Sequence, residues 1–196
     1  MQLSAPRAGR ASRTRPITAL VLAIAALAAA SPSQALAARS QAVACRSAST
    51  LPVDVDTDSV RRATLCLLNE ERERRGLARL RHNAQLAAAA RRHARDMVTR
   101  SYFAHDSLSG ASFVDRIEQT GYTRNVSWTL GENLAWGSGR LASPLEIVKA
   151  WMASPGHRAN VLGRFREVGV GLAEGAPVDA RGLSAHTYAS EFGTRR

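Results

Sequence analysis

Two histidines and one glutamate occupy positions where their side chains could do chemistry. His105 lies in a polar loop with an acid beside it, and His157 follows a Ser-Pro pair that can start a helix. The positive end of a helix favours a neutral imidazole, which suits a metal ligand or a general base. Glu132 follows a glycine in a predicted strand, between Trp128 and Trp136. A carboxylate among apolar neighbours is costly unless it is paired. The three residues are therefore candidates for one site, although their spacing alone does not show that they converge.

The remaining histidines and one nearby serine have simpler explanations. His82 lies in a predicted turn, His93 on the apolar stripe of a predicted helix, and His186 at the start of the last predicted strand. We expect His82 to be solvated, His93 to lie in the core and His186 to lie at the rim of the site. Ser154 lies three residues before His157 and could act as a nucleophile. A serine directly before a proline at a helix start is more typically an N-cap.

Apolar periodicity, capping residues and glycines predict the elements that must position these side chains. Helices are predicted from Ser59 to Gly76, over 84–99, and as shorter segments that start at Ser112, Ser143 and Ser154; strands are predicted over 126–136, 168–173 and 186–192. Helices first, and then strands mixed with helices, are typical of helices packed on an antiparallel sheet. The sequence therefore predicts a single α+β domain.

The first 37 residues have the pattern of a secretory signal peptide. Residues 1–15 carry four arginines and no acid, a largely apolar run follows over 17–30, and alanines occupy positions 35 and 37. That order predicts cleavage after Ala37 and a secreted mature chain. An uncleaved membrane anchor is the alternative, but a span needs about 20 apolar residues, and no later segment approaches that length. We predict a signal peptide at 1–37, an extended N-terminal arm at 38–58 and a folded domain at 59–196.

Secretion decides how the two cysteines are interpreted. Cys45 and Cys66 are 21 positions apart, and both would remain in the mature chain. A disulfide is the default in an oxidising compartment, and closing a loop of this size would stabilise the fold by about 3 kcal/mol. A free reactive thiol or a pair of metal ligands are alternatives, but the two cysteines have no partner at the spacing of a metal site.

The chain is basic, with 27 Lys and Arg against 16 Asp and Glu and a net charge of +11 at pH 7. Lys149 is its single lysine, so the excess of arginine indicates compositional bias. Removal of 1–37 would lower the net charge to +7, because that segment holds four arginines and no acid. Such a charge favours contact with anionic envelope polymers. Nucleic acid is not an expected partner, because the arginines are dispersed among acids without interleaved aromatic residues.

Short motifs spread over about 60–195 occur in a characteristic order. They are Asn69-Glu70-x-Arg72, Gly76-Leu77, Leu86-x-x-x-Ala90-x-x-His93-x-x-x-Met97, Phe103-x-His105, Gly131-Glu132-Asn133-Leu134-Ala135-x-Gly137, Trp151-Met152-x-Ser154-Pro155-Gly156-His157-Arg158-x-Asn160-x-Leu162, Val168-Gly169-Val170-Gly171 and Phe192-Gly193. Each motif alone is weak, but the ordered set is specific. It resembles a bacterial CAP-superfamily domain, of the SCP-like extracellular group related to cysteine-rich secretory proteins, insect venom antigen 5 and plant pathogenesis-related proteins.

This resemblance implies a three-layer α-β-α sandwich with a central antiparallel sheet. It also implies a surface cleft in which His105, Glu132 and His157 match the two histidines and one acid of the family. Some relatives bind zinc or another divalent ion through the histidines, so His105 and His157 are the metal-ligand candidates here, with Glu132 as a third group. Animal and plant members usually carry a second acid where this chain has Ser154. Its absence leaves fewer ligands than a closed four-ligand site has.

Family resemblance indicates fold far better than activity. We expect a secreted binding module for a small apolar or lipidic ligand, or for a cell-envelope component, through the His/Glu cleft. Asn133 and Asn160 are candidate hydrogen-bonding residues at its rim, although structural anchoring would explain them equally well. The alternatives are a cell-wall interaction protein and a metal-dependent hydrolase that uses Glu132 as a base. The missing acid argues against an enzyme, and no cofactor is required beyond the divalent ion that the resemblance allows.

Overall fold

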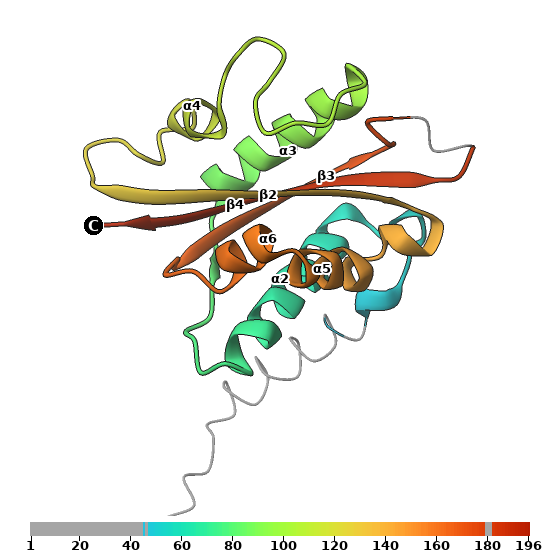
Figure 1. Cartoon of the computed structure of the whole chain (residues 1–196), viewed down its shortest axis with the longest axis horizontal. Helices are drawn as coiled ribbons and strands as arrows, with labels where there is room; N and C mark the ends of the chain where they lie inside the picture. The colour runs from blue at the N-terminus through green and yellow to red at the C-terminus, as the bar shows by residue number, and fades with distance from the viewer. Residues whose placement is uncertain (1–44, 46, 179–181) are drawn as a thin grey trace, which may run out of the picture. The chain divides into compact units, whose positions relative to one another are not determined.

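The computed structural model describes residue 45 and residues 47–178 and 182–196. The predicted signal peptide at 1–37 and the first residues of the predicted arm lie outside the described residues. Within the described part, helices cover both faces of a four-stranded sheet (Figure 1). The elements are η1 (Ser47–Ser49), η2 (Pro52–Asp54), α2 (Thr57–Glu73), β1 (Arg81–His82), α3 (Ala84–Thr99), α4 (Phe113–Glu118), β2 (Trp128–Ser138), η3 (Gly139–Ala142), α5 (Pro144–Ala153), α6 (Pro155–Val161), β3 (Glu167–Glu174) and β4 (Ala185–Arg195).

The sheet has the order β1-β3-β4-β2, and β4 pairs antiparallel with both of its neighbours. β1 was not predicted: Arg81 and His82, expected in a turn, pair parallel with the start of β3. A two-residue strand gives almost no alternating pattern, so its sequence does not reveal it. The predicted antiparallel sheet is confirmed for the three long strands, and one short parallel strand is added to it.

The three layers are held by separate apolar clusters. α3 and α4 lie on one face of the sheet, and α2, α5 and α6 lie on the other (Figure 1). Trp151 of α5 and Tyr188 and Phe192 of β4 are buried in the larger cluster, on the α2–α5 side. Met97 of α3 packs in a smaller cluster with Leu134 of β2. The predicted α+β sandwich is therefore confirmed.

Two glycines explain how closely α3 approaches the sheet. A Cβ atom at Gly169 would lie 1.9 Å from the backbone nitrogen of Ala87, and one at Gly171 would lie 2.2 Å from the backbone carbon of Ala90. Because these contacts are to backbone, no side-chain rotation could relieve them. The Val-Gly-Val-Gly pattern of β3 thus presents small residues to the alanine-rich helix α3 and valines to the opposite face.

Most predicted helix starts are confirmed, and one is wrong. The Ser112–Asp115 capping box precedes α4, and the Ser143 side chain caps α5. Helix α2 begins at Thr57 rather than at Ser59, because the Asp56 side chain accepts the backbone hydrogen bond from Ser59 at 2.9 Å. The acid is at least as good a cap as the serine, and the helix gains two residues by using it.

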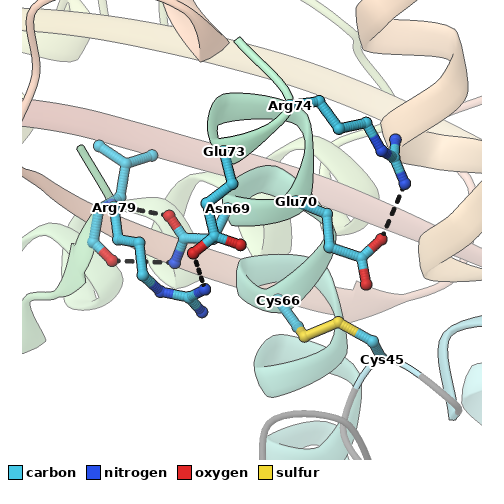
Figure 2. Close-up of a disulfide and its surroundings, with 8 residues drawn as sticks. Cys45, Cys66, Asn69, Glu70, Glu73, Arg74 and Arg79 are labelled. Atoms are coloured by element: carbon cyan, nitrogen blue, oxygen red, sulfur yellow. Dashed lines mark hydrogen bonds and ion pairs between the residues drawn. A yellow bond between two sulfur atoms is a disulfide. The ribbon is translucent and has the colours of Figure 1, made fainter. Parts of the chain in front are cut away.

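The predicted disulfide between Cys45 and Cys66 is present, with 5.5 Å between the two Cα atoms (Figure 2). It ties the segment before η1 to α2.

On the same helix Asn69 donates to the carbonyl of Leu80 at 3.0 Å and accepts from its backbone nitrogen at 2.7 Å. These bonds fix the chain that leads into β1. No helix in the described part of the chain is both long and apolar enough to cross a bilayer.

Candidate functional site

Glu132 lies at the centre of a charged cluster on β2. Its side chain is only 1% exposed, and its two carboxylate oxygens have different partners. Nδ1 of His105 donates to Oε1 at 2.7 Å, and Nη2 of Arg116 donates to Oε2 at 2.6 Å. Burial alone would raise the pKa of Glu132, but the bond from His105 and the charge of Arg116 outweigh it and hold the pKa below its usual value. Glu132 is therefore a charged and fully engaged carboxylate.

A second carboxyl group, which the sequence did not point to, faces Glu132 from the neighbouring strand. Glu191 of β4 pairs with Glu132 in the sheet register and is completely buried. Burial and the charge of Glu132 raise the pKa of Glu191 well above its ordinary value. Two carboxylates at opposed positions repel one another. Of the two carboxyl groups, Glu191 therefore holds a proton more readily than Glu132, and their opposed positions favour a single negative charge on the pair.

Two buried basic side chains hold the loop that carries His105. Arg116 of α4 also donates to the carbonyl of Ala111 at 3.1 Å. His93 of α3 donates from Nε2 to the carbonyl of Ala104 at 2.9 Å. Burial, followed by the charge of Arg116, lowers the pKa of His93, so its ring is neutral. His93, which the sequence predicted to be a core histidine, therefore anchors the loop at Ala104, the residue before His105.

His105 is the accessible member of the cluster. Its side chain is 55% exposed, whereas those of Arg116 and Glu132 are buried. The hydrogen bond to Glu132 raises the pKa of His105, despite its partial burial. Since Nδ1 faces the carboxylate, the ring orientation is fixed and Nε2 is left to contact other molecules. The site thus presents one exposed imidazole, that of His105, whose positive charge is stabilised by the buried carboxylate of Glu132.

His157 approaches from the opposite layer of the sandwich. It lies in α6, and burial and then the charge of His105 lower the pKa of its ring. The two histidines are therefore near enough to influence one another's titration. Side chains alternate along a strand, so Glu132 faces α3 and α4 while Asn133 faces α6. The structure brings His105 into direct contact with Glu132, and it places His157, whose backbone carbonyl is held by Asn133, near enough for the charge of His105 to act on its ring.

Two asparagines fix α6 against β2. Asn133 donates to the carbonyl of His157 at 3.0 Å, and Asn160 donates to the side-chain oxygen of Asn133 at 2.9 Å. Asn160 also donates to the backbone carbonyl of Glu132 at 2.9 Å. A Cβ atom at Gly131 would lie 2.9 Å from the Asn160 side-chain oxygen, which explains the glycine before Glu132. In this structure both asparagines make anchoring contacts that hold His157 in place.

Arg72 of α2 fastens the other end of α6. Its guanidinium donates to the carbonyls of Val161 at 2.7 Å and Gly163 at 2.9 Å, and it is almost fully buried. A cation at a helix C-terminus satisfies carbonyls that have no partner within the helix. Ser154 occupies the N-cap position of α6, as expected, but its side chain makes no capping hydrogen bond. In the sequence Arg72 stood out only as part of the Asn69-Glu70-x-Arg72 motif, and no local signal predicted its contacts with the end of α6.

The donor atoms fit a divalent ion only through the two histidines. Nε2 of His105 and the neutral ring of His157 could hold zinc, and a carboxylate on the far nitrogen is the usual outer partner of a ligating histidine. Both oxygens of Glu132 are already engaged, so its contacts suit orientation of the ring better than ligation. Among the described residues, Cys45, Cys66 and Glu70 form a group of three metal-type donors within 4.8 Å. Its two sulfurs are joined in the disulfide, so it is not a metal site.

Comparisons with known proteins agree with the fold and the motifs. Residues 65–188 match the model of the cysteine-rich secretory protein family, CAP. The chain is 38% identical over 113 residues to the uncharacterized protein YkwD of Bacillus subtilis (strain 168), a match that covers 57% of this chain and 42% of YkwD. The matched part thus spans less than half the length of that relative.

Two solved structures share the architecture. An outer surface protein from Borrelia burgdorferi has a TM-score of 0.59 at 20% identity, over 72% of this chain and 97% of that protein. An extracellular protein containing a SCP domain from Bacillus anthracis has a TM-score of 0.54 at 26% identity, over 70% of this chain and 43% of that protein. Because the family match covers more than half of the sequence, the chain belongs to the CAP family of cysteine-rich secretory proteins.

Proposed function

We propose that this protein is secreted and acts as a binding module, with His105 as the residue that contacts the ligand. His157 and the Glu132 cluster position and tune the site. The ligand is a small apolar or lipidic molecule, or a cell-envelope component, that carries an anionic or hydrogen-bond-accepting group. The disulfide supports secretion, because such bonds persist in oxidising compartments. The Bacillus anthracis relative is described as extracellular, which also supports it.

One observation carries the choice of binding over hydrolysis: both carboxylate oxygens of Glu132 are occupied. A general base must be free to accept a proton, and its pKa should lie near the working pH. The pKa of Glu132 is instead lowered by its bonds to His105 and Arg116. Glu191 is completely buried, so it cannot serve as the base either. The arrangement fixes a donor at the surface and leaves neither Glu132 nor Glu191 available for activating water.

The surroundings of His105 suggest the chemical class of the ligand. Phe103 and Leu108, in the same loop, expose 43% and 56% of their surfaces. The raised pKa of His105 favours an imidazolium, which pairs with a carboxylate or phosphate. An apolar chain with an acidic head group would therefore use both features. A medium- or long-chain fatty acid is the simplest probe of that class.

The test is a titration with a fluorescent fatty acid, read by the change in emission on binding. The parent should bind more tightly at pH 6 than at pH 9, because His105 loses its charge as the pH rises through its raised pKa. His105→Gln should weaken binding by about tenfold, the loss of one charge-assisted contact. His82→Gln is the matched control, since His82 is exposed on the far edge of the sheet. Equal binding by parent and His105→Gln would reject the proposed site.

Zinc binding is a second candidate function, and the orientation of His105 favours it. The bond from Nδ1 to Glu132 leaves Nε2 available for a metal, as in many zinc sites. Zinc should then raise the melting temperature of the parent, and His157→Ala should remove most of that response. The response should weaken below about pH 6, where histidine ligands are protonated. An unchanged melting curve with zinc at neutral pH would reject metal binding and leave the fatty-acid test unaffected.

A further inference from the structure

Five arginines gather at the edge of the sheet farthest from His105. Arg61 and Arg62 lie on α2, and Arg91, Arg92 and Arg95 lie on α3. We call them the arginine surface. The two helices cover opposite faces of the sheet, and both pack against β3 near its edge (Figure 1). The charge of Arg91 acts on Arg61 and, after burial, contributes to lowering the pKa of Arg61. Arg61 and Arg91 are therefore near enough to repel one another, which links the two groups.

The short strand β1 explains why this edge is hollow. β1 pairs only with Glu167 and Val168, so the rest of β3 has no neighbouring strand on that side. A hollow of about 370 Å³ lies beside the edge and is lined by Arg61, Arg62, Leu65, Val168 and Val170, among others. A second hollow of about 210 Å³ is lined by Arg91, Arg92 and Arg95 with Asp96 and Thr99. The arginines thus line recessed surface rather than an evenly convex one.

The charge of the arginine surface is largely unneutralised. Arg61 is paired with Asp58, and Arg62 lies 4.0 Å from Asp56. Within the described residues, no hydrogen bond or ion pair is found for the guanidinium groups of Arg91, Arg92 or Arg95. The neighbouring acid, Asp96, instead accepts a hydrogen bond from Tyr102 and lies 3.8 Å from Arg100. Just after α2, by contrast, Arg74 and Arg75 are paired with Glu70 and Glu71 of the helix.

We propose that the arginine surface binds a linear polyanion whose charges are phosphodiesters, namely an anionic glycerol-phosphate-type polymer of a cell envelope. Guanidinium groups match phosphate oxygens in bidentate geometry. Five cations along an edge suit several phosphates of one chain better than a single small anion. No Phe, Tyr or Trp lines either hollow, so the stacking platforms typical of single-stranded nucleic acid binding are missing there. The surface is separate from the His105 site and does not depend on it.

The test compares two variants of equal charge, each prepared from the full chain. Arg91→Gln/Arg92→Gln/Arg95→Gln removes three cations from the arginine surface. Arg124→Gln/Arg140→Gln/Arg164→Gln removes three exposed cations from other parts of the molecule. Binding to poly(glycerol phosphate) is measured by calorimetry across a salt series, with neutral dextran and a single-stranded oligonucleotide as the other probes. Thermal unfolding confirms that each variant is folded.

The parent should bind poly(glycerol phosphate) and not dextran, with affinity that falls as salt rises. The arginine-surface variant should bind roughly tenfold or more weakly at moderate salt, and the slope of log affinity against log salt should fall by about 2. The control variant should lose much less. Equal losses in both variants would show only general charge attraction and overturn the assignment of this surface. Tighter binding to the oligonucleotide would overturn the choice of polymer, and no binding by the parent at low salt would overturn the proposal outright.

Discussion

The two edges of the sheet use charged side chains in opposite ways. At the β2 edge, Glu132 is buried with Arg116 and faces the buried carboxyl of Glu191. At the β3 edge, Arg91, Arg92 and Arg95 are exposed, and their guanidinium groups lack acidic partners within the described residues. Charged side chains in a buried network have few alternative partners. Their contacts therefore determine the position of the loop that they hold, which carries His105. Exposed charges constrain little of the fold, which leaves them available to another molecule.

The difference also separates two physical regimes. Ion pairs buried in protein are screened weakly by salt, whereas exposed charges are screened within about 10 Å at 0.1 M ionic strength. Removing one partner from a buried network leaves an uncompensated charge, and that is costly. Removing an exposed, unpaired arginine costs little and relieves repulsion from its neighbours. Stability measurements should therefore respond to the β2 edge, and binding measurements to the β3 edge.

The largest effect on stability is expected from Arg116→Met. This change leaves Glu132 charged and buried without its guanidinium partner, and it should lower the free energy of unfolding by about 3–5 kcal/mol. Arg92→Met is the matched control on the exposed edge and should change that free energy by no more than about 0.5 kcal/mol. Both values come from urea denaturation at pH 7. Similar losses in the two variants would contradict the contrast between the edges.

A smaller, pH-dependent effect is expected from Glu191→Gln. The folded state raises the pKa of Glu191 above its unfolded value of about 4.3. The parent therefore loses stability as the pH rises from that value toward the folded pKa. Glutamine resembles the protonated acid, so the variant should match the parent near pH 4 and exceed it at pH 7 by more than about 0.5 kcal/mol.

Glu118→Gln is the control for that measurement, because Glu118 is exposed on α4. It should change the free energy of unfolding little at any pH. A Glu191→Gln variant that is less stable than the parent at pH 7 would show that Glu191 is needed as a charged group.

The smallest effect is a difference in histidine titration, measured by NMR on the folded protein. His105 should titrate above the usual value of about 6.5, while His93, His157 and His186 should titrate below it. Burial is the main cause of the three lowered values. The triple substitution of Arg91, Arg92 and Arg95 should leave His105 unchanged, because those residues lie at the opposite edge. A titration of His105 below the usual value would contradict its pairing with Glu132.

Local signals in the sequence predicted much of the fold. The capping box before α4 and the Ser143-Pro144 start of α5 depend on neighbouring residues, so they could be predicted without knowledge of the tertiary structure. The need of Glu132 for a partner also followed from its apolar surroundings. Which residues would contact Glu132 could not be predicted from the sequence. Glu191 faces Glu132 only because of the β2–β4 register, although an acid inside the predicted strand 186–192 was a signal.

The arginine surface illustrates the same limit. Arg61 and Arg91 are separated by a helix end and β1, and their sequence neighbours include acids, so the arginines looked dispersed. They converge because the two helices cover opposite faces of one sheet and β1 stops after two residues. Long-range convergence of this kind depends on where an edge strand ends, and no local pattern encodes that.

The position of His105 and His157 on opposite layers has a mechanical consequence. Both are anchored to β2: Glu132 holds the first ring, and Asn133 holds the helix that carries the second. A ligand that contacted both rings would link the two helical layers of the sandwich noncovalently. Its binding energy would then oppose separation of the layers, so α3 and α6 should gain protection from amide exchange together, although neither helix belongs to the other's apolar cluster.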